Sequence, residues 1–502
     1  MPSIKPNLLG LLASVSAILE QDNCQAYVVG GFVRDLLLNR ETNDIDIAVR
    51  DNAVEIANKI ADHLGGRYVL LDEVNHVARV VITELTTPLY LDFSTVLATI
   101  EEDLARRDFT IDAMGMELRV FLSGSMHVID PFKGKNDLKR KVIRAVSQRI
   151  FKDDAARLWR AVRLAAQLEF RIEPKTEQLM KQDAKLIILV AGERQRNELI
   201  KLLTLPCCGY WIRYLDKIRL LTQVIPELEE LRGVEQPKEH YWDVLEHSLE
   251  TVSTTEFLLH ERDWKYGSDD LLKLAPWSEE LKRHFDDEVA SDSNRRVMLK
   301  IGALLHDIAK PQMKTIDETG RIRFIGHAKE GAIKATDVLA RLRFSSREIK
   351  LVDGLITYHL RPIQIANSGL PTSRAIYRYF RDTGDAGIDI FFLALADYLA
   401  ARGPRLDIEE WEQQNHLISY MITEHKEQRD ERLPIKLVDG HDLMAAFGLT
   451  SGPLIGKLLR LVHEAQALGE IGTAEEAIKL VRRALEKDRC GGDNGAVSVG
   501  HD

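Results

Sequence analysis

The chain has 502 residues, of which 29% are charged and 45% hydrophobic, and its formal net charge is −10. These values are typical of a soluble protein of two or three domains, and the negative charge argues against a generally basic nucleic-acid-binding surface. No run of about 18 apolar residues occurs, so we expect no membrane-spanning helix. The few cysteines lack zinc-ligand spacing, which favours reduced thiols in a cytoplasmic protein.

The first regular pattern is a set of leucine, valine and isoleucine residues at helical spacing over 8–19. A core strand follows almost at once, so we expect an amphipathic helix that covers a sheet, not a secretion signal. Short strands and helices then alternate to about residue 140. The expected strands are 27–29, 67–71, 78–84 and 89–93, and the expected helix is 53–64.

The segment AYVVGGFVRDLLLNRETNDIDIAV places a paired glycine and two carboxylates in a strand, turn, helix and strand. Gly30 and Gly31 lie at the turn, where backbone N–H groups can approach a phosphate closely. Asp44 and Asp46 are two residues apart on a strand, so both side chains lie on one face. Each feature alone is more often structural. Their combination indicates Mg²⁺ held against a triphosphate.

Further carboxylates and arginines follow this segment. Asp92, in LYLDFS, lies on a strand expected beside the DIDI strand, as a third metal ligand, a general base or only a strand-end residue. Arg106 and Arg107 precede Asp108 in EEDLARRDFTIDAM. Helix capping would explain Asp108, but two adjacent arginines near a phosphate site favour a functional role.

A helix is expected to begin near Asp153, with Asp154 and Arg157 on one face and Arg160 and Arg163 extending it. This pattern fits a helix with an acidic first turn and a solvated basic edge. It also fits base recognition, because a carboxylate can accept from an exocyclic amine while an arginine donates to a ring nitrogen. Cytosine and adenine offer both groups, so such a pair would select CTP and ATP without a template.

Several motifs together resemble the class II tRNA nucleotidyltransferases and the related bacterial poly(A) polymerases over about residues 24–205. They are GGFVRD, DIDI, LARRDFTIDAM, DPFKGKNDLKRKVIRAV, DDAARLWRAVRLAAQLEF and ERQRNELIKLL. The resemblance implies an α+β protein, with a polymerase-β-like palm built on a mixed sheet, followed by an all-α neck, body and tail. It also implies that SGPLIGKLLRLVHEAQALGEIGTAEEAIKLVRRAL is a C-terminal segment that grips RNA.

The resemblance also implies site residues. Asp44 and Asp46 would hold catalytic Mg²⁺. From its strand position, Asp92 is expected beside them as a third catalytic carboxylate. The residues expected to contact the nucleotide are Gly30, Gly31, Arg34, Arg107, Asp108, Asp154, Arg157, Arg160 and Arg163. Within this set Arg107 and Asp108 would contact triphosphate and ribose, and Asp154 and Arg157 would read the base. A helix with Glu193, Arg194 and Arg196 would support the base-reading helix.

Two departures from the family pattern matter. The base-reading motif begins Asp153-Asp154 where the family usually has Glu-Asp. Only LATIEEDLA separates the Asp92 strand from Arg106, whereas CCA-adding members usually carry a longer flexible loop that helps the switch from C to A addition. Members that add only CC are similar to this chain in lacking that loop, so the short connection argues against terminal A addition and leaves CC addition alone as one reading.

The middle of the chain contains a second constellation of histidines and aspartates, several in apolar segments, and the adjacent His306 and Asp307 are expected inside an apolar helix. A buried unpaired carboxylate is costly, so Asp397 needs a cation or strong hydrogen bonds. The pattern resembles the HD phosphohydrolase superfamily. That resemblance implies one divalent metal, of unspecified identity, on His247, His306, Asp307 and Asp397. It also implies a second site completed by His327 and His359, and a phosphate contact from Lys310.

The expected domains are a palm at 1–140, a neck and body at 141–232, an HD domain at 240–430, an RNA-binding segment at 434–486 and a disordered tail at 487–502. We expect a template-independent enzyme that adds C, A or both to the tRNA 3′ end from CTP and ATP. The alternatives are a poly(A) polymerase or A-adding enzyme, an HD phosphohydrolase with a nucleotide-sensing front module, and an HD domain whose metal is structural. The sequence leaves the oligomeric state and the HD substrate open.

Overall fold

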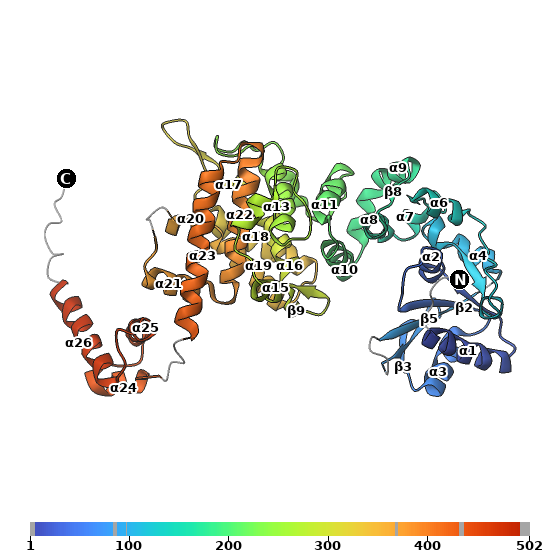
Figure 1. Ribbon diagram of the computed structural model, residues 1–502, viewed down its shortest axis with the longest axis horizontal. Helices are drawn as coiled ribbons and strands as arrows, with labels where there is room; N and C mark the ends of the chain where they lie inside the picture. The colour runs from blue at the N-terminus through green and yellow to red at the C-terminus, as the bar shows by residue number, and fades with distance from the viewer. Residues whose placement is uncertain (1–5, 84–87, 97, 367–369, 431–435, 492–502) are drawn as a thin grey trace, which may run out of the picture. The chain divides into compact units, whose positions relative to one another are not determined.

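The computed structural model describes residues 6–83, 88–96, 98–366, 370–430 and 436–491 (Figure 1). The chain divides into two compact units, Met1–Pro226 and Glu227–Asp502. The first contains a large mixed sheet and helices, and the second is helical apart from short hairpins. The expected α+β fold with a helical continuation is confirmed.

The sheet of the first unit has six strands in the order β3-β4-β5-β2-β1-β6. Its strands are β1 (Ala26–Val29), β2 (Asp44–Val49), β3 (Arg67–Asp72), β4 (Val77–Ile82), β5 (Leu89–Thr95) and β6 (Gly115–Glu117). The β2–β5 pair is parallel and the other pairs are antiparallel. The four expected strands are confirmed, although the third ends at Ile82 and the remainder of its expected range includes Glu84, outside the described residues.

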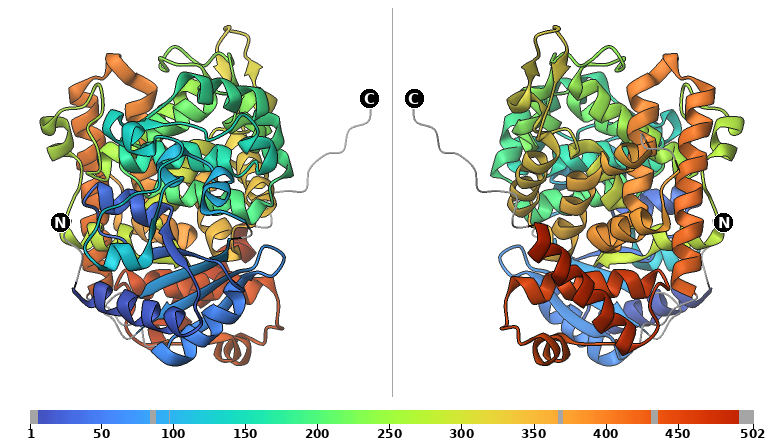
Figure 2. Two further views of the ribbon diagram at one scale, coloured as in Figure 1. Left: turned by 90° about the vertical axis from the view of Figure 1, so that its right-hand side faces the viewer. Right: turned by 90° about the vertical axis from the view of Figure 1, so that its left-hand side faces the viewer.

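Helices flank this sheet. They are α1 (Pro6–Gln21), α2 (Gly31–Leu37), α3 (Ala53–Leu64), α4 (Ile100–Ala105), α5 (Leu118–Leu122) and α6 (Gly134–Arg140). Helix α3 is capped by Asn52, whose side chain accepts from the Val54 N–H, and the helix packs on β4 and β5. Helix α1 packs against α3 and α5, next to the sheet in Figure 2. The expected N-terminal helix is therefore confirmed.

The rest of the first unit is almost entirely helical. It comprises α7 (Ile150–Asp153), α8 (Arg157–Leu168), α9 (Pro174–Asp183), α10 (Gly192–Leu203), α11 (Cys208–Lys217) and α12 (Leu221–Val224), with the short strands β7 (Val142–Ile143) and β8 (Arg171–Ile172). The single helix expected from Asp153 is wrong. Asp154 is extended (φ −151°, ψ 106°), and its side chain accepts from the Ala156 N–H, so it separates α7 from α8.

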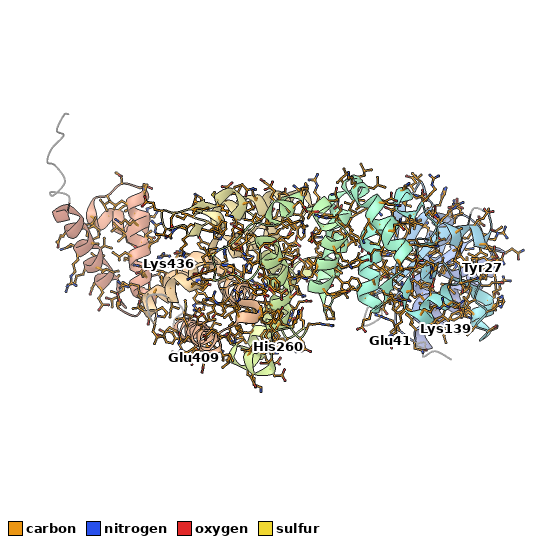
Figure 3. The ribbon with its side chains drawn as sticks, turned by 90° about the horizontal axis from the view of Figure 1, so that it is seen from above. Tyr27, Glu41, Lys139, His260, Glu409 and Lys436 are labelled. Atoms are coloured by element: carbon orange, nitrogen blue, oxygen red, sulfur yellow. The ribbon has the colours of Figure 1, made fainter. Side chains whose placement is uncertain are left out.

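The second unit is built from helices whose side chains fill the space between them (Figure 3). Its helices are α13 (Val244–Leu258), α14 (Asp269–Leu274), α15 (Glu279–Asp286), α16 (Arg295–Leu305), α17 (Lys310–Met313), α18 (His327–Arg341), α19 (Ser346–Tyr358), α20 (Arg361–Ala366), α21 (Ser373–Thr383), α22 (Gly387–Arg402), α23 (Ile408–Asp430), α24 (Gly440–Phe447), α25 (Pro453–Ala467) and α26 (Ala474–Gly491). The hairpin strands are β9 (Glu288–Ala290), β10 (Ser293–Asn294), β11 (Thr315–Ile316) and β12 (Ile322–Arg323).

Helices α13, α16 and α22 pack against one another and form the centre of this unit. Helices α24 to α26 share a separate hydrophobic cluster. Helix α26 continues to Gly491, so residues 487–491 of the expected disordered tail are helical, and 492–502 lie outside the described residues. The expected boundary near Leu433 and Pro434 also lies outside them. Within the described part of the chain, no helix is long and apolar enough to cross a bilayer.

Candidate active site and metal centre

The turn between β1 and α2 requires glycine at position 30. Gly30 has φ +69° and ψ −137°, a conformation that L side chains rarely adopt. A Cβ there would overlap Nη1 of Arg107 and stand 2.6 Å from Oδ2 of Asp46. The next backbone N–H, of Gly31, donates to the Asp46 carboxylate. The turn therefore brings backbone donors, an arginine and a carboxylate to one point.

Gly30→Ala is expected to lower the free energy of unfolding by about 1–3 kcal/mol, because it combines backbone strain with a clash. The same substitution displaces Arg107, so nucleotide affinity should fall as well. Thermal unfolding and nucleotide titration measure the two effects, with Gly10→Ala as control, because a Cβ at Gly10 meets nothing within 4 Å. Equal behaviour of the two variants would contradict the geometry of this turn.

Three carboxylates gather beside the turn. Asp44 and Asp46 are alternate residues of β2, and Asp92 lies directly opposite Asp46 in the parallel β2–β5 register. Burial raises the pKa of Asp44 and of Asp46, and the neighbouring Asp92 raises both further, although Arg79 and Arg107 oppose these shifts. Carboxylates whose charged forms are disfavoured by each other fit a divalent cation with oxygen ligands. The expected placement of Asp92 is confirmed.

Sequence reasoning missed Arg79. Its guanidinium donates two hydrogen bonds to Asp92, Nε to Oδ1 at 2.7 Å and Nη2 to Oδ2 at 2.8 Å. Arg79 lies opposite Asp92 in the antiparallel β4–β5 register. Cross-strand pairing of opposite charges could have suggested this contact. Asp92 therefore faces the carboxylates while its own oxygens are held by an arginine.

Arg34 lies against the glycine turn, since a Cβ on Gly31 would stand 3.4 Å from its Nη2. Its guanidinium donates to both oxygens of Asp35, at 2.9 and 2.8 Å, and to Asp112 Oδ1 at 2.6 Å. All three side chains are buried. This network holds the Arg34 guanidinium beside the turn, and its expected contact with the nucleotide stays a prediction.

Asp108, which follows α4, forms an ion pair with Arg160 of α8. Arg160 Nη1 donates to Asp108 Oδ2 at 3.0 Å, and the Phe109 N–H donates to Oδ1 at 2.9 Å. Although burial disfavours the charge, Arg160 holds the pKa of Asp108 below its usual range. Asp108 is thus ionised and fixed, with Arg160 half exposed beside it.

The two expected base-reading residues come from different elements. Asp154 precedes α8 and accepts from Arg194 Nη2 of α10 at 2.8 Å. Arg157 is the first residue of α8 and donates from Nη2 to the Arg106 carbonyl at 2.8 Å. They therefore do not share a helix face, although each is held by a partner. The expected support from α10 is confirmed at Arg194.

A second support from α10 comes from a residue that sequence reasoning passed over. Glu198 accepts from Arg163 Nε at 2.6 Å, and both side chains are largely buried. Arg163 therefore connects α8 to α10. Its expected contact with the nucleotide stays a prediction, and in the structure its Nε is held by Glu198.

The histidines and aspartates of the second unit converge on one point. His247 Nε2 lies 3.2 Å from His306 Nε2 and 3.0 Å from Asp397 Oδ1, and His306 Nε2 lies 3.2 Å from Asp307 Oδ2. Ligands of one metal ion with bonds of about 2.1 Å are roughly 3–4 Å apart. The other Asp307 oxygen lies 3.4 Å from His327 Nε2, which is 3.3 Å from His359 Nε2.

Helix ends set the orientation of three of these rings. His306 and His359 directly follow α16 and α19, and His327 begins α18. Their Nδ1 atoms lie 2.9, 2.7 and 2.6 Å from the carbonyls of the residues three positions earlier. When Nδ1–H donates to a carbonyl, the Nε2 atom of the neutral ring keeps its lone pair for a metal. Nε2 lone pairs that face one another fit a cation between them. The His-Asp dipeptide was expected inside a helix, and the structure places it after the helix end.

The charge states also fit metal binding. Burial lowers the pKa of His359 to about 3 and that of His247 below its ordinary value, so both rings are neutral near pH 7. Although burial opposes it, His306 together with Lys310 lowers the pKa of Asp307 well below the usual range. Although burial lowers it, Asp307 raises the pKa of His306 above its ordinary value in the absence of a metal. The neutral imidazoles of His247 and His359 beside ionised carboxylates are donors that suit a divalent transition metal.

Sequence reasoning missed His240. Its ring lies 5.3 Å from that of His247, and the two rings and Asp397 form a further group with metal-ligand spacing. The sequence could have suggested His240, because it lies only seven positions before His247, which is near the start of α13. Burial lowers the pKa of His240 to about 3, so it too is neutral.

The histidine and aspartate cluster opens into a cavity of about 630 Å³. Basic side chains in its lining are Lys310, Arg321, Arg323 and Arg402, and aromatic ones are Phe324 and Tyr398. Basic groups around a metal cluster fit a phosphate, and aromatic groups fit a stacked ring. The expected residues His327, His359, Asp307 and Asp397 line the same cavity.

Comparisons with known proteins agree with this arrangement. Residues 26–144 match the poly A polymerase head domain, 169–231 the probable RNA and SrmB-binding site of polymerase A, and 244–402 the HD domain. The A-adding tRNA nucleotidyltransferase of Deinococcus radiodurans is 33% identical over 92% of this chain and 96% of the relative. The CC-adding tRNA nucleotidyltransferase of Thermus thermophilus is 32% identical over 90% and 92%.

Solved structures share the fold. The Thermotoga maritima CCA-adding enzyme complexed with tRNA matches with a TM-score of 0.60 and 24% identity, over 96% of both chains. A CCA-adding enzyme in complex with CTP matches with a TM-score of 0.63 and 24% identity, over 99% of this chain and 97% of that one.

Proposed function

Since the chain belongs to the tRNA nucleotidyltransferase family, we propose that it adds cytidylate residues to the 3′ end of tRNA without a template. Asp44 and Asp46 would hold Mg²⁺ at the Gly30–Gly31 turn, with Asp92 beside them. Bound Mg²⁺ would lower the pKa of the RNA 3′-hydroxyl and neutralise the departing pyrophosphate. Arg107 and the Gly31 region would bind the triphosphate.

Base selection is assigned to Asp154 and Arg157. Arg194 keeps the Asp154 carboxylate ionised as an acceptor, because that partner lowers its pKa against the effect of burial. The Arg157 guanidinium, steadied by the Arg106 carbonyl, has further N–H groups for a ring nitrogen. CTP and ATP fit this donor and acceptor pair.

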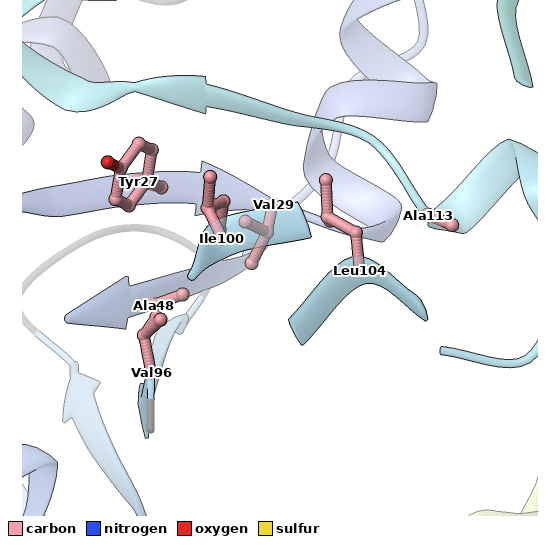
Figure 4. Packing of buried hydrophobic residues seen from close by; sticks show 7 residues of the cluster. All are labelled: Tyr27, Val29, Ala48, Val96, Ile100, Leu104 and Ala113. Carbon is pink, nitrogen blue, oxygen red and sulfur yellow. The ribbon is translucent and has the colours of Figure 1, made fainter. Parts of the chain in front are cut away.

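The observation that carries CC addition is the short connection between β5 and Arg106. It contains helix α4, whose Ile100 and Leu104 pack in the core beneath the sheet (Figure 4). Because α4 fills most of this connection and packs in the core, the connection has no residues left for a flexible loop. The A-adding and CC-adding relatives are almost equally identical to this chain, so identity does not decide between the two activities.

The test is incorporation of each labelled NTP into tRNA transcripts that end before CCA, after C and after CC. We expect CTP to be incorporated into the first two and ATP into none. ATP incorporated into the CC-ended transcript would favour an A-adding or CCA-adding enzyme. Long ATP tails on unrelated RNA would favour a poly(A) polymerase.

A second activity is proposed for the HD domain, where His247, His306, Asp307, Asp397, His327 and His359 would hold two divalent ions. Such ions activate water for attack on a phosphate ester. The basic and aromatic cavity supports this role. Metal analysis together with hydrolysis of bis(p-nitrophenyl) phosphate tests it. Bound metal without hydrolysis of any phosphate ester would favour a structural site.

The domain limits and location follow from these assignments as proposals. A palm at 1–140 and a body at 141–232 would carry the transferase, 240–430 the HD site and 434–486 an RNA contact. Reduced thiols at Cys24, Cys207 and Cys208 support a cytoplasmic location. If the front half were only a nucleotide sensor, alanine at Asp44 and Asp46 would spare the main activity.

A further inference from the structure

Helix α4 is fixed at its start, along one face and at its end. The Thr99 side chain accepts from the Glu102 N–H at 3.2 Å. Ile100 and Leu104 are 6% and 0% exposed and pack with Tyr27 and Val29 of β1 (Figure 4). The carbonyl that follows the helix, at Arg106, accepts from Arg157. A residue at the edge of this buried face of α4 therefore has a defined position.

Asp103 is such a residue, and it faces Arg107 one turn later. Asp103 Oδ2 and Arg107 Nε are 3.7 Å apart, and the two side chains are 19% and 21% exposed. Both atoms are buried, and neither has a hydrogen-bond partner among the described residues. Opposite charges at this distance attract strongly where water is excluded.

The other end of the Arg107 guanidinium reaches the catalytic turn. Its Nη1 occupies the space that a Cβ on Gly30 would take, and Asp46 Oδ2 lies beside the same point. Its charge also counters the rise in the pKa of Asp46. Arg107 thus stands between Asp103 at its Nε edge and Asp46 at its Nη atoms.

We propose that Asp103 is a positioning residue that holds Arg107 for the nucleotide triphosphate; this inference rests on the proposed transferase function. Asp103 attracts the Nε edge of the Arg107 guanidinium, so the Nη atoms of Arg107 stay directed at the turn when Asp46 binds a metal ion. Without Asp103, Arg107 is drawn onto Asp46, where it competes with the metal and no longer faces the phosphates. Sequence spacing alone gives an i,i+4 pair with no indication of this role.

The test compares Asp103→Asn, Asp103→Glu and Glu102→Gln in the full-length protein, Glu102 being exposed on the same helix. Asp103→Asn is expected to raise the KM for CTP and the Mg²⁺ concentration for half-maximal activity about tenfold, the effect of one charge-assisted contact. The kcat and the KM for tRNA should change less than twofold. Asp103→Glu should recover most of the CTP affinity, and Glu102→Gln should match the wild type.

A CTP KM for Asp103→Asn equal to that of Glu102→Gln would overturn the inference. So would equal losses in kcat, both KM values and thermal stability without recovery in Asp103→Glu, because those describe only a folding defect. A wild-type protein that incorporates no CTP would overturn the proposed function and this inference with it. An active wild type with an unchanged Asp103→Asn variant would overturn this inference alone.

Discussion

Asp46→Asn is expected to lower the kcat for CTP incorporation into tRNA by about 10³-fold or more. Asp46 is a β2 carboxylate between the Gly31 N–H and Arg107, where loss of its charge removes a ligand for the catalytic cation. Asparagine keeps an oxygen that can accept from Gly31, so the fold should survive. Single-turnover incorporation with saturating CTP measures the chemical step.

Asp62→Asn is the matched control, since Asp62 lies exposed on α3 of the same unit. Circular dichroism and thermal unfolding should show both variants folded, and the metal content of the HD site should be unchanged in both. If Asp46→Asn retained activity within tenfold of the control, the DIDI strand would not be the catalytic centre.

Asp307→Asn is expected to remove both divalent ions from the HD site and to lower phosphate-ester hydrolysis by at least about 10²-fold. One Asp307 oxygen lies near His247 and His306, and the other lies near His327. A single neutral substitution therefore weakens both halves of the cluster. Metal analysis after dialysis measures the loss directly.

Incorporation of CTP should stay within twofold of wild type in this variant. Asp337→Asn, on the exposed face of α18, controls for the loss of one charge in the same unit. A variant that kept two bound ions would show that Asp307 is not shared, and loss of CTP incorporation would show that the two sites depend on each other.

The carboxylate site of the first unit could be predicted from short motifs, because alternation along a strand fixes the face of the sheet on which each side chain lies. The spacing of Asp44 and Asp46 placed both on one face, and Asp92 was correctly placed beside them. The partners of these groups depend on register and packing, which spacing does not encode. Arg79 beside Asp92, and Glu198 beside Arg163, illustrate this limit.

Two predicted helix boundaries were wrong because side chains there contact nearby backbone groups. The Asp154 side chain binds the backbone two residues later, which breaks the helix that periodicity predicted. His306 Nδ1 contacts the Ala303 carbonyl at the end of α16. The His-Asp pair therefore follows the helix end instead of lying within a helix. Apolar periodicity continues past both points and gives no sign of either.

The most direct test of the central claim is the 3′ sequence of the product made from tRNA lacking CCA in the presence of all four NTPs. A CC-adding enzyme built on Asp44 and Asp46 should give tRNA ending in CC, with no terminal A even after long incubation. Products ending in CCA, or unextended tRNA, would contradict it.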